Sequence, residues 1–117
     1  MRKHDLLASM VMALAFAAAA MAAPPDASIE TTFDRNKGKL YAEYRKALRE
    51  QPGLKGRVDL EFTVSTLGKA SGCRVVRDEL PAPQLVASLC DIVEAMSFDA
   101  RKAPTTVTKP LTFFPVG

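Results

Sequence analysis

Few side chains in this 117-residue sequence could carry out chemistry. The single histidine is His4, and the two cysteines are Cys73 and Cys90. A cysteine nucleophile normally needs a neighbouring histidine to activate it, and two thiols without histidine make a poor zinc site. Asp91 and Glu94 could share acid–base work, but paired carboxylates on one helical turn usually belong to a solvated face. A small exported enzyme is therefore the least favoured hypothesis, and the sequence predicts no catalytic site, no metal site and no cofactor.

The N-terminal residues have the order of a secretory signal peptide. Two basic residues precede an apolar run from Leu6 to Ala20, and the small residues Ala20 and Ala22 match a cleavage site. The alternative is an uncleaved membrane anchor, for which this run is short of the roughly 20 apolar residues that a spanning helix needs. We predict that residues 1–22 are removed after export, and that His4 is lost with them.

The remaining chain is close to neutral. Cleavage removes Arg2, Lys3 and Asp5, which reduces 16 basic and 13 acidic residues to 14 and 12 and leaves a net charge of +2. A nucleic-acid-binding domain usually carries a strong excess of basic residues on one surface. No nucleic-acid partner is therefore expected, and residues 23–117 are enough for one small domain with a modest core.

The two cysteines that remain after cleavage predict a disulfide. An even number of cysteines in a small exported domain favours pairing, because the compartment outside the cytoplasm is oxidising. A helix packed on the sheet could bring Cys90 close enough to Cys73 for a bond. The alternative is two separate thiols that pack as small core residues.

The most regular stretch of the chain is a predicted β-hairpin over residues 56–77. Apolar and polar residues alternate strictly from Val58 to Val64, which is typical of a half-buried strand. Gly68 can take the positive φ that the connecting loop needs. A shorter second strand is expected through residues 71–75, with Cys73 on its inward side if the alternation is counted from Ser71. A lone hairpin is at best marginally stable, so its apolar face needs a cover.

Two amphipathic helices can provide that cover. After a short leader at residues 23–28, apolar residues recur at helical spacing from Ile29 to Leu48, and Pro52-Gly53 ends the pattern, with Gly53 favouring a left-handed cap. Gly38 is unfavourable inside a helix, so the helix is expected to kink there or to begin near Lys37. A second helix is expected from Pro83 to Met96. Its apolar stripe is formed by Leu85, Leu89, Ile92 and Met96.

A third strand is expected from Thr105 to Phe114, after a polar connection at residues 98–103. Pro110 cannot donate to a strand ladder, so this strand suits a sheet edge or carries a bulge. Its apolar residues fall on one face, with Lys109 as the exception.

The element order leads to one topology. A right-handed crossover from the second strand through the second helix places the third strand beside the first. The sequence thus predicts an α+β domain over residues 29–117, with a three-stranded antiparallel sheet in the order 2-1-3 and two helices on one face.

Several motifs in this order resemble a known family. They are Asn36-Lys37-Gly38-Lys39-Leu40-Tyr41, Pro52-Gly53-Leu54, Gly56-Arg57-Val58, Cys73-Arg74-Val75-Val76 and Val107-Thr108-Lys109-Pro110-Leu111-Thr112-Phe113-Phe114-Pro115. Their order and spacing resemble the TonB C-terminal-like domain family, and within it the AgmX/PglI C-terminal domain subgroup. The resemblance covers nearly all of the chain after the predicted signal peptide.

This resemblance implies a non-enzymatic, periplasmic protein-binding module with no small-molecule substrate. In TonB an edge strand pairs with a short peptide of an outer-membrane transporter, and the corresponding strand here is Thr105 to Phe114. An envelope protein or peptide is then the expected partner. The expected contact residues are Thr105, Thr106, Val107, Thr108, Lys109, Leu111 and Thr112.

Three alternatives stay open at this point. The chain could be a TonB-like energy-transduction or transport accessory protein, anchored in the inner membrane if the signal is uncleaved. Lys109 and Pro110 could block pairing at the edge, as lysine and proline do in many edge strands. The basic residues of the first helix could bind a partner or simply form a solvated face.

Overall fold

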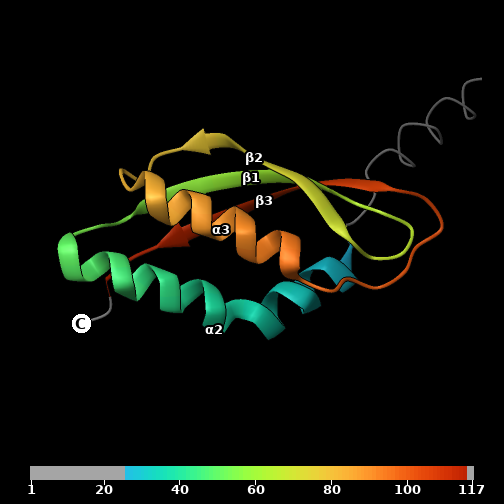
Figure 1. Cartoon of the computed structure of the whole chain (residues 1–117), viewed down its shortest axis with the longest axis horizontal. Coiled ribbons are helices and arrows are strands. Elements are labelled where there is room, and N and C mark those ends of the chain that lie inside the picture. Colours follow the sequence, from blue (N-terminus) through green and yellow to red (C-terminus); the bar gives the residue numbers. More distant parts are fainter. Residues whose placement is uncertain (1–25, 116–117) are drawn as a thin grey trace, which may run out of the picture.

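The computed structural model describes residues 26–115, so the predicted signal peptide lies outside the described residues. The elements are α2 (Ala27–Glu50), β1 (Gly56–Val64), β2 (Ala70–Asp78), α3 (Pro83–Ala95) and β3 (Thr105–Phe113). The strands form one antiparallel sheet in the order β2-β1-β3, and both helices lie on the same side of it (Figure 1). The predicted α+β architecture and strand order are confirmed.

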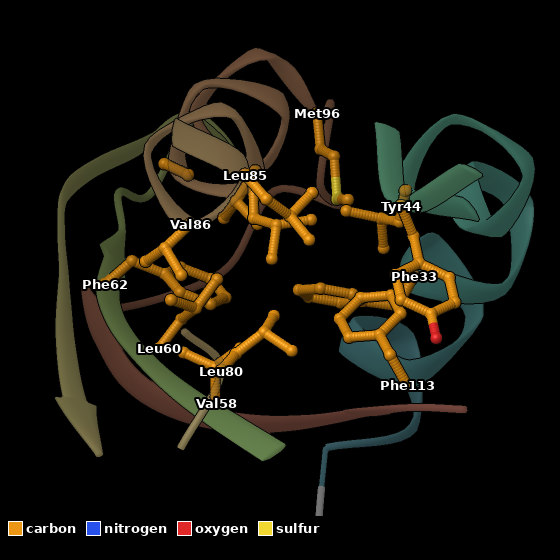
Figure 2. Packing of buried hydrophobic residues seen from close by; sticks show 14 of the residues in the cluster. Phe33, Tyr44, Val58, Leu60, Phe62, Leu80, Leu85, Val86, Met96 and Phe113 are labelled. Atoms are coloured by element: carbon orange, nitrogen blue, oxygen red, sulfur yellow. The ribbon is translucent and has the colours of Figure 1, made fainter. Parts of the chain in front are cut away.

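The inner face of β1 forms the centre of the core. Its four apolar side chains are at most 1% exposed; they are Val58, Leu60, Phe62 and Val64. They pack against apolar side chains of both helices, which fill the space between helices and sheet (Figure 2). Burying each side chain of this size stabilises the fold by roughly 1.5–3 kcal/mol. The alternation predicted from the sequence is therefore confirmed.

The first helix, α2, is one continuous helix of 24 residues that begins at Ala27. It continues through Gly38, so a start near Lys37 is wrong. It ends because Gln51 precedes Pro52 and takes a non-helical conformation, with φ −131° and ψ 83°. Gly53 is not among the glycines with positive φ, so the predicted left-handed cap is also wrong.

The second strand, β2, is as long as β1 and is bulged twice. Its pairing with β1 shifts between Asp59 and Leu60 and again between Glu61 and Thr63. Gly72, with φ 65°, lies at the second shift. Ser71 is exposed there, whereas Cys73 is half-buried against the core. The predicted inward position of Cys73 is confirmed, and Val75 shares that side. The prediction of a shorter strand is wrong, and Ser71 does not share the inward side, because a bulge reverses the facing of the residues beyond it.

A disulfide joins β2 to α3. Cys73 and Cys90 are bonded, and their Cα atoms lie 5.5 Å apart. This separation is typical of disulfides in proteins. The pairing predicted from the cysteine count is therefore present, and the alternative of two separate thiols is wrong.

The connection between α3 and β3 was predicted to be polar, but it contains a buried aromatic residue, Phe98. Phe98 is 6% exposed, and its ring centroid lies 6.1 Å from that of Phe33 and 5.8 Å from that of Phe62. Its N–H donates to the carbonyl of Gly68 at 3.0 Å. Gly68 has φ 85°, and a Cβ there would lie 2.1 Å from the Phe98 carbonyl oxygen. Glycine is therefore needed both for the β1–β2 turn and for this close contact.

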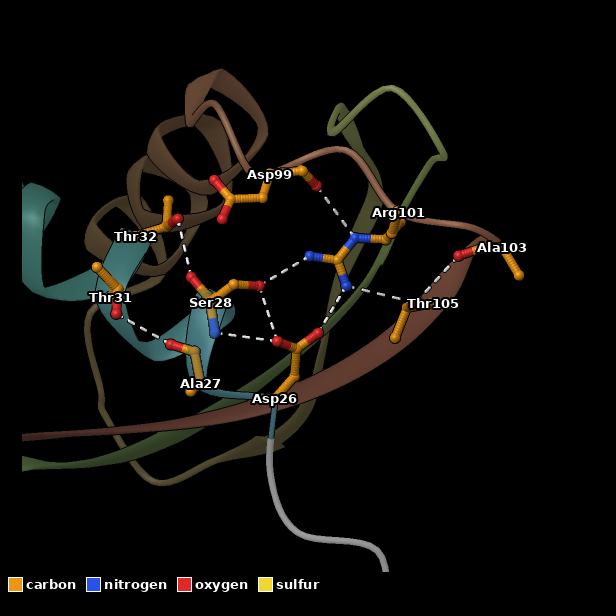
Figure 3. A network of polar contacts seen from close by, with 9 residues as sticks. All are labelled: Asp26, Ala27, Ser28, Thr31, Thr32, Asp99, Arg101, Ala103 and Thr105. Carbon is orange, nitrogen blue, oxygen red and sulfur yellow. Dashed lines mark hydrogen bonds and ion pairs between the residues drawn. The ribbon is translucent and has the colours of Figure 1, made fainter.

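Arg101 holds the start of α2 against the start of β3 (Figure 3). Its guanidinium lies 2.7 Å from Asp26 Oδ2, 3.2 Å from Ser28 Oγ and 3.5 Å from Thr105 Oγ1. Asp26 also caps the helix, because its Oδ1 accepts the Ser28 N–H at 3.0 Å. Hydrogen bonds from Ser28 and Arg101 lower the pKa of Asp26 to about 2. The network sets the position at which α2 begins to run beside β3.

Replacing Asp26 should make the free energy of unfolding less dependent on pH in the acid range. Asp26→Ala removes the N-cap and should lower the free energy of unfolding by about 1 kcal/mol at pH 7. Because the pKa of Asp26 is lower in the folded state than its usual 3.8, this contribution is present above pH 3.8 and is lost as the pH falls through about 2. Urea unfolding followed by circular dichroism at pH 7 and pH 2.5 measures both effects. Asp34→Ala is the matched control, and a pH-independent difference for Asp26→Ala would contradict the expectation.

Opening the disulfide should lower the free energy of unfolding by about 3 kcal/mol, as expected for a closed loop of 17 residues. The double variant Cys73→Ala/Cys90→Ala should unfold at a lower urea concentration than the wild type. A reductant should bring the wild type to the midpoint of the variant and leave the variant unchanged. Equal midpoints with and without the bond would show that it adds no stability.

Candidate functional site

Three of the residues that could have carried chemistry make structural contacts: Cys73, Cys90 and Glu94. The sulfur atoms of Cys73 and Cys90 are bonded to each other. Glu94 Oε2 accepts the backbone N–H of Cys73 at 2.8 Å, and Asp91 is exposed on α3. Within residues 26–115, no three His, Cys, Asp or Glu side chains lie close enough together to hold a metal ion.

The outer face of the sheet, which neither helix covers, carries charges that pair with one another. Arg57 lies 2.8 Å from Asp59, and the hydrogen bond from Arg57 lowers the pKa of that carboxyl. Arg74 lies 2.7 Å from Glu61. Asp59 is only 9% exposed, whereas the Arg74–Glu61 pair is exposed. Exposed ion pairs contribute little free energy and favour solvation of the surface. Nothing on this face points to a ligand.

The two edges of the sheet are a different case, because an unpaired strand edge can bind another chain. The β2 edge is closed. Two bulges make it irregular, the Glu94 carboxylate occupies the N–H of Cys73, and the Cys73–Cys90 bond holds α3 against the strand. A further strand has no regular ladder to join on this side.

The β3 edge is regular. All nine residues pair with β1 without a shift in register, and Pro110 stands opposite Asp59. Alternate residues of an antiparallel strand direct both backbone groups to the same side. Since Pro110 has no N–H and the ladder to β1 is unbroken, Pro110 belongs to the set that faces away from β1. The N–H groups of Thr106, Thr108 and Thr112 therefore point away from β1. We call this side of β3 its free edge, because no other strand of residues 26–115 pairs there.

The side chains of β3 alternate as well. Thr105, Val107, Lys109, Leu111 and Phe113 are buried or half-buried towards the helices, and the residues between them are exposed. The ammonium of Lys109, the exception in the predicted pattern, lies 2.8 Å from Glu30 Oε1 and 5.2 Å from the centroid of the Phe33 ring. The charge of Lys109 is thus directed at α2 rather than at the free edge. Pro110 lies at an edge without a bulge, which is one of the two predicted outcomes.

A groove of about 270 Å³ runs between α2 and β3. We call it the α2–β3 groove. From α2 it is lined by Phe33, Asp34, Lys37, Leu40 and Tyr41, and from β3 by Lys109, Pro110, Leu111, Thr112 and Phe113. Only the β3 side was predicted from the sequence. The helical side could have been found from Phe33, Lys37 and Tyr41, whose spacing of four residues places them on one face of the helix.

A second hollow, of about 470 Å³, lies between the C-terminal half of α2 and the start of α3. Charged and polar side chains dominate it, including Glu43, Lys46, Glu50 and Gln51. It is not adjacent to a free strand edge. In the part of the chain that the structure describes, no helix is long and apolar enough to cross a membrane.

Comparison with known proteins leaves the family open. No family model matches the chain, and no curated protein matches it. Among solved structures, the chain is similar to the solution NMR structure of the C-terminal domain of TonB from Helicobacter pylori. The two share 12% sequence identity with a TM-score of 0.48, over 79% of this chain and 96% of that chain. At this level the likeness assigns neither a family nor a partner.

Amide hydrogen exchange should distinguish the two edges. On β3 the amides of Thr106, Thr108 and Thr112 should exchange faster than those of Val107 and Leu111, because only the latter donate to β1.

On β2 the Cys73 amide should be protected by Glu94. Glu94→Ala should speed exchange at Cys73, whereas Asp91→Ala, a matched loss of a carboxylate on the same helix, should not. Uniform protection along β3 would show that its edge is not free.

Proposed function

We propose that the chain is a non-enzymatic protein-binding module that recognises an extended peptide by pairing with the free edge of β3. The contrast between the two edges of the sheet carries this proposal. Bulges, a carboxylate and a disulfide close the β2 edge, whereas β3 has nine residues in regular register and a groove beside it. Edge pairing of this kind draws affinity from backbone hydrogen bonds and selectivity from alternate side chains.

The ladder would use the outward backbone groups of Thr106, Thr108 and Thr112. Pro110 offers its carbonyl but no donor, so pairing is strongest over the first half of β3 and is interrupted in the second. Side chains of the inward set would meet the inward side chains of the bound peptide. The contact residues proposed are Thr105, Thr106, Val107, Thr108, Lys109, Leu111 and Thr112.

The proposed partner is an envelope protein or peptide, and the proposed location is the periplasm. The order of basic, apolar and small residues within residues 1–22 supports export. The Cys73–Cys90 bond is consistent with an oxidising compartment. The motifs from Asn36 to Pro115 support placing the chain near the TonB C-terminal-like domains, with the AgmX/PglI subgroup as the more specific proposal.

A second proline in β3 tests the edge. Thr108→Pro removes an N–H that points away from β1, so it should abolish partner capture and leave the circular dichroism spectrum unchanged. Thr108→Ala is the matched control, because it removes the side chain and keeps the N–H. Affinity purification from the native envelope, quantified by mass spectrometry, should recover a partner with the wild type and Thr108→Ala. Recovery of the same partner with Thr108→Pro would contradict pairing at the β3 edge.

A further inference from the structure

The side of α2 that faces away from the core is basic along most of its length. The buried residues of α2 lie on one side of the helix, and α2 itself forms one side of the domain (Figure 1). On the opposite side, four basic side chains fall within about 80° of one another, because each residue advances the helix by about 100°. They are Arg35, Lys39, Lys46 and Arg49, and all four are exposed. We call them the α2 basic stripe, which extends over about 21 Å of helix.

Three cations of the stripe have no acidic partner in the part of the chain that the structure describes. Only Lys46 makes an ion pair, with Glu43 at 2.9 Å, and its side chain is still 62% exposed. The other ion pairs of residues 26–115 involve no residue of the stripe. Arg35 and Lys39 are four residues apart, and like charges at this spacing destabilise a helix. The stripe thus keeps a local repulsion that an anionic surface would relieve.

Small residues leave the cations of the stripe unshielded. Gly38 and Ala42 lie on the same side of the helix, between Arg35 and Lys46 in the sequence. Glycine is unfavourable inside a helix, and the fold does not require it here. Gly38 is not among the glycines with positive φ, and a Cβ at this position would meet no atom within 4 Å. The side is therefore straight and cationic, without a bulky neutral side chain between its charges, which fits a broad anionic surface.

We infer that the α2 basic stripe docks on an anionic lipid bilayer. A cluster of four or more Lys and Arg residues on one helix is typical of contacts with anionic head groups. The place of α2 in the chain favours lipid over an acidic protein. Asp26 caps α2 and directly follows residues 1–25, whose apolar run from Leu6 to Ala20 is predicted to enter the membrane during export. α2 is the first element of the domain to follow that run.

Docking through the stripe leaves the β3 edge uncovered. Lys37 and Tyr41, which line the α2–β3 groove, lie on a different side of the helix from the stripe. The stripe contains no large apolar side chain, so the contact is electrostatic, reversible and weakened by salt. The inference therefore goes beyond the proposed edge pairing and does not depend on it.

Vesicle sedimentation tests the docking with the chain that begins at Ala23 and lacks the apolar run. All buried residues of the core lie within residues 29–113, so this chain retains the whole fold. It should bind vesicles made of equal parts of phosphatidylglycerol and phosphatidylcholine, and it should not bind vesicles of phosphatidylcholine alone. Raising the NaCl concentration from about 0.05 M to about 0.3 M should release it. Binding to both kinds of vesicle, or to neither, would overturn the inference.

Two double variants with the same loss of charge assign the binding to the stripe. Arg35→Gln/Lys39→Gln should weaken binding about tenfold or more, because it removes two cations that face the lipid. The matched control is Lys37→Gln/Lys102→Gln, at exposed residues outside the stripe, which should weaken binding by less than about threefold. Both should keep the circular dichroism spectrum of the wild type, since none of these side chains makes an ion pair within residues 26–115. Equal weakening by the two variants would show that net charge alone governs binding and would overturn the role of the stripe.

A charge-conserving variant and a second probe complete the test. Arg35→Lys/Lys39→Arg keeps both charges and should bind the vesicles as the wild type does, and loss of binding would contradict an electrostatic contact. Poly-L-glutamate represents an acidic protein partner. Amide chemical shifts at the stripe with poly-L-glutamate, but not with the phosphatidylglycerol vesicles, would assign the stripe to such a partner and overturn docking on lipid.

Discussion

Four apolar side chains on one face of β1 have to be removed from water, and most of the architecture follows from how this is done. Both helices lie on that face, because the opposite face of the sheet carries arginine, aspartate, glutamate and threonine. With three strands and one covered face, the domain buries a modest core and keeps a solvated outer surface. Two strand edges remain, and the covering helices decide what becomes of them.

The two helices pack differently beside the two edges of the sheet. α3 is fastened to β2 by the Cys73–Cys90 bond and by the carboxylate of Glu94, so that edge is occupied. α2 is fastened beside β3 at both ends, through Arg101 near Thr105 and through the aromatic rings around Phe113. Between those ends it leaves a groove open to the β3 edge. The same packing that stabilises the core thus creates one closed edge and one regular edge at which no other strand of residues 26–115 pairs.

Much of the fold could be predicted because it depends on local patterns. The alternation of β1 follows from residue spacing, and the edge position of β3 follows from the absence of an N–H on Pro110. The pairing of the cysteines follows from their even number after a predicted export signal. The polar connection predicted after α3 failed because that segment responds to distant neighbours. Phe98 is buried because Phe33 and Phe62 offer it a site, and nothing beside it in the sequence indicates that.

For the candidate site, the sequence identified only the β3 side of the α2–β3 groove. The residues of β3 were predicted to bind a partner because the strand lies at a sheet edge. Phe33, Lys37 and Tyr41 were interpreted only as part of an amphipathic, basic helix. Their place beside the edge depends on the direction in which α2 crosses the sheet, which Arg101 and Asp26 set over 75 residues of sequence.

The sequence by itself determined the class of domain, the strand order and the lack of a histidine after the predicted cleavage site. Only the tertiary structure decided that β2 is closed, that Lys109 is directed at Glu30, and that a groove lies over the β3 edge. The physical reason is the range of the interactions. Periodicity and backbone donors act within a few residues, whereas an edge is free or closed according to which distant side chain reaches it.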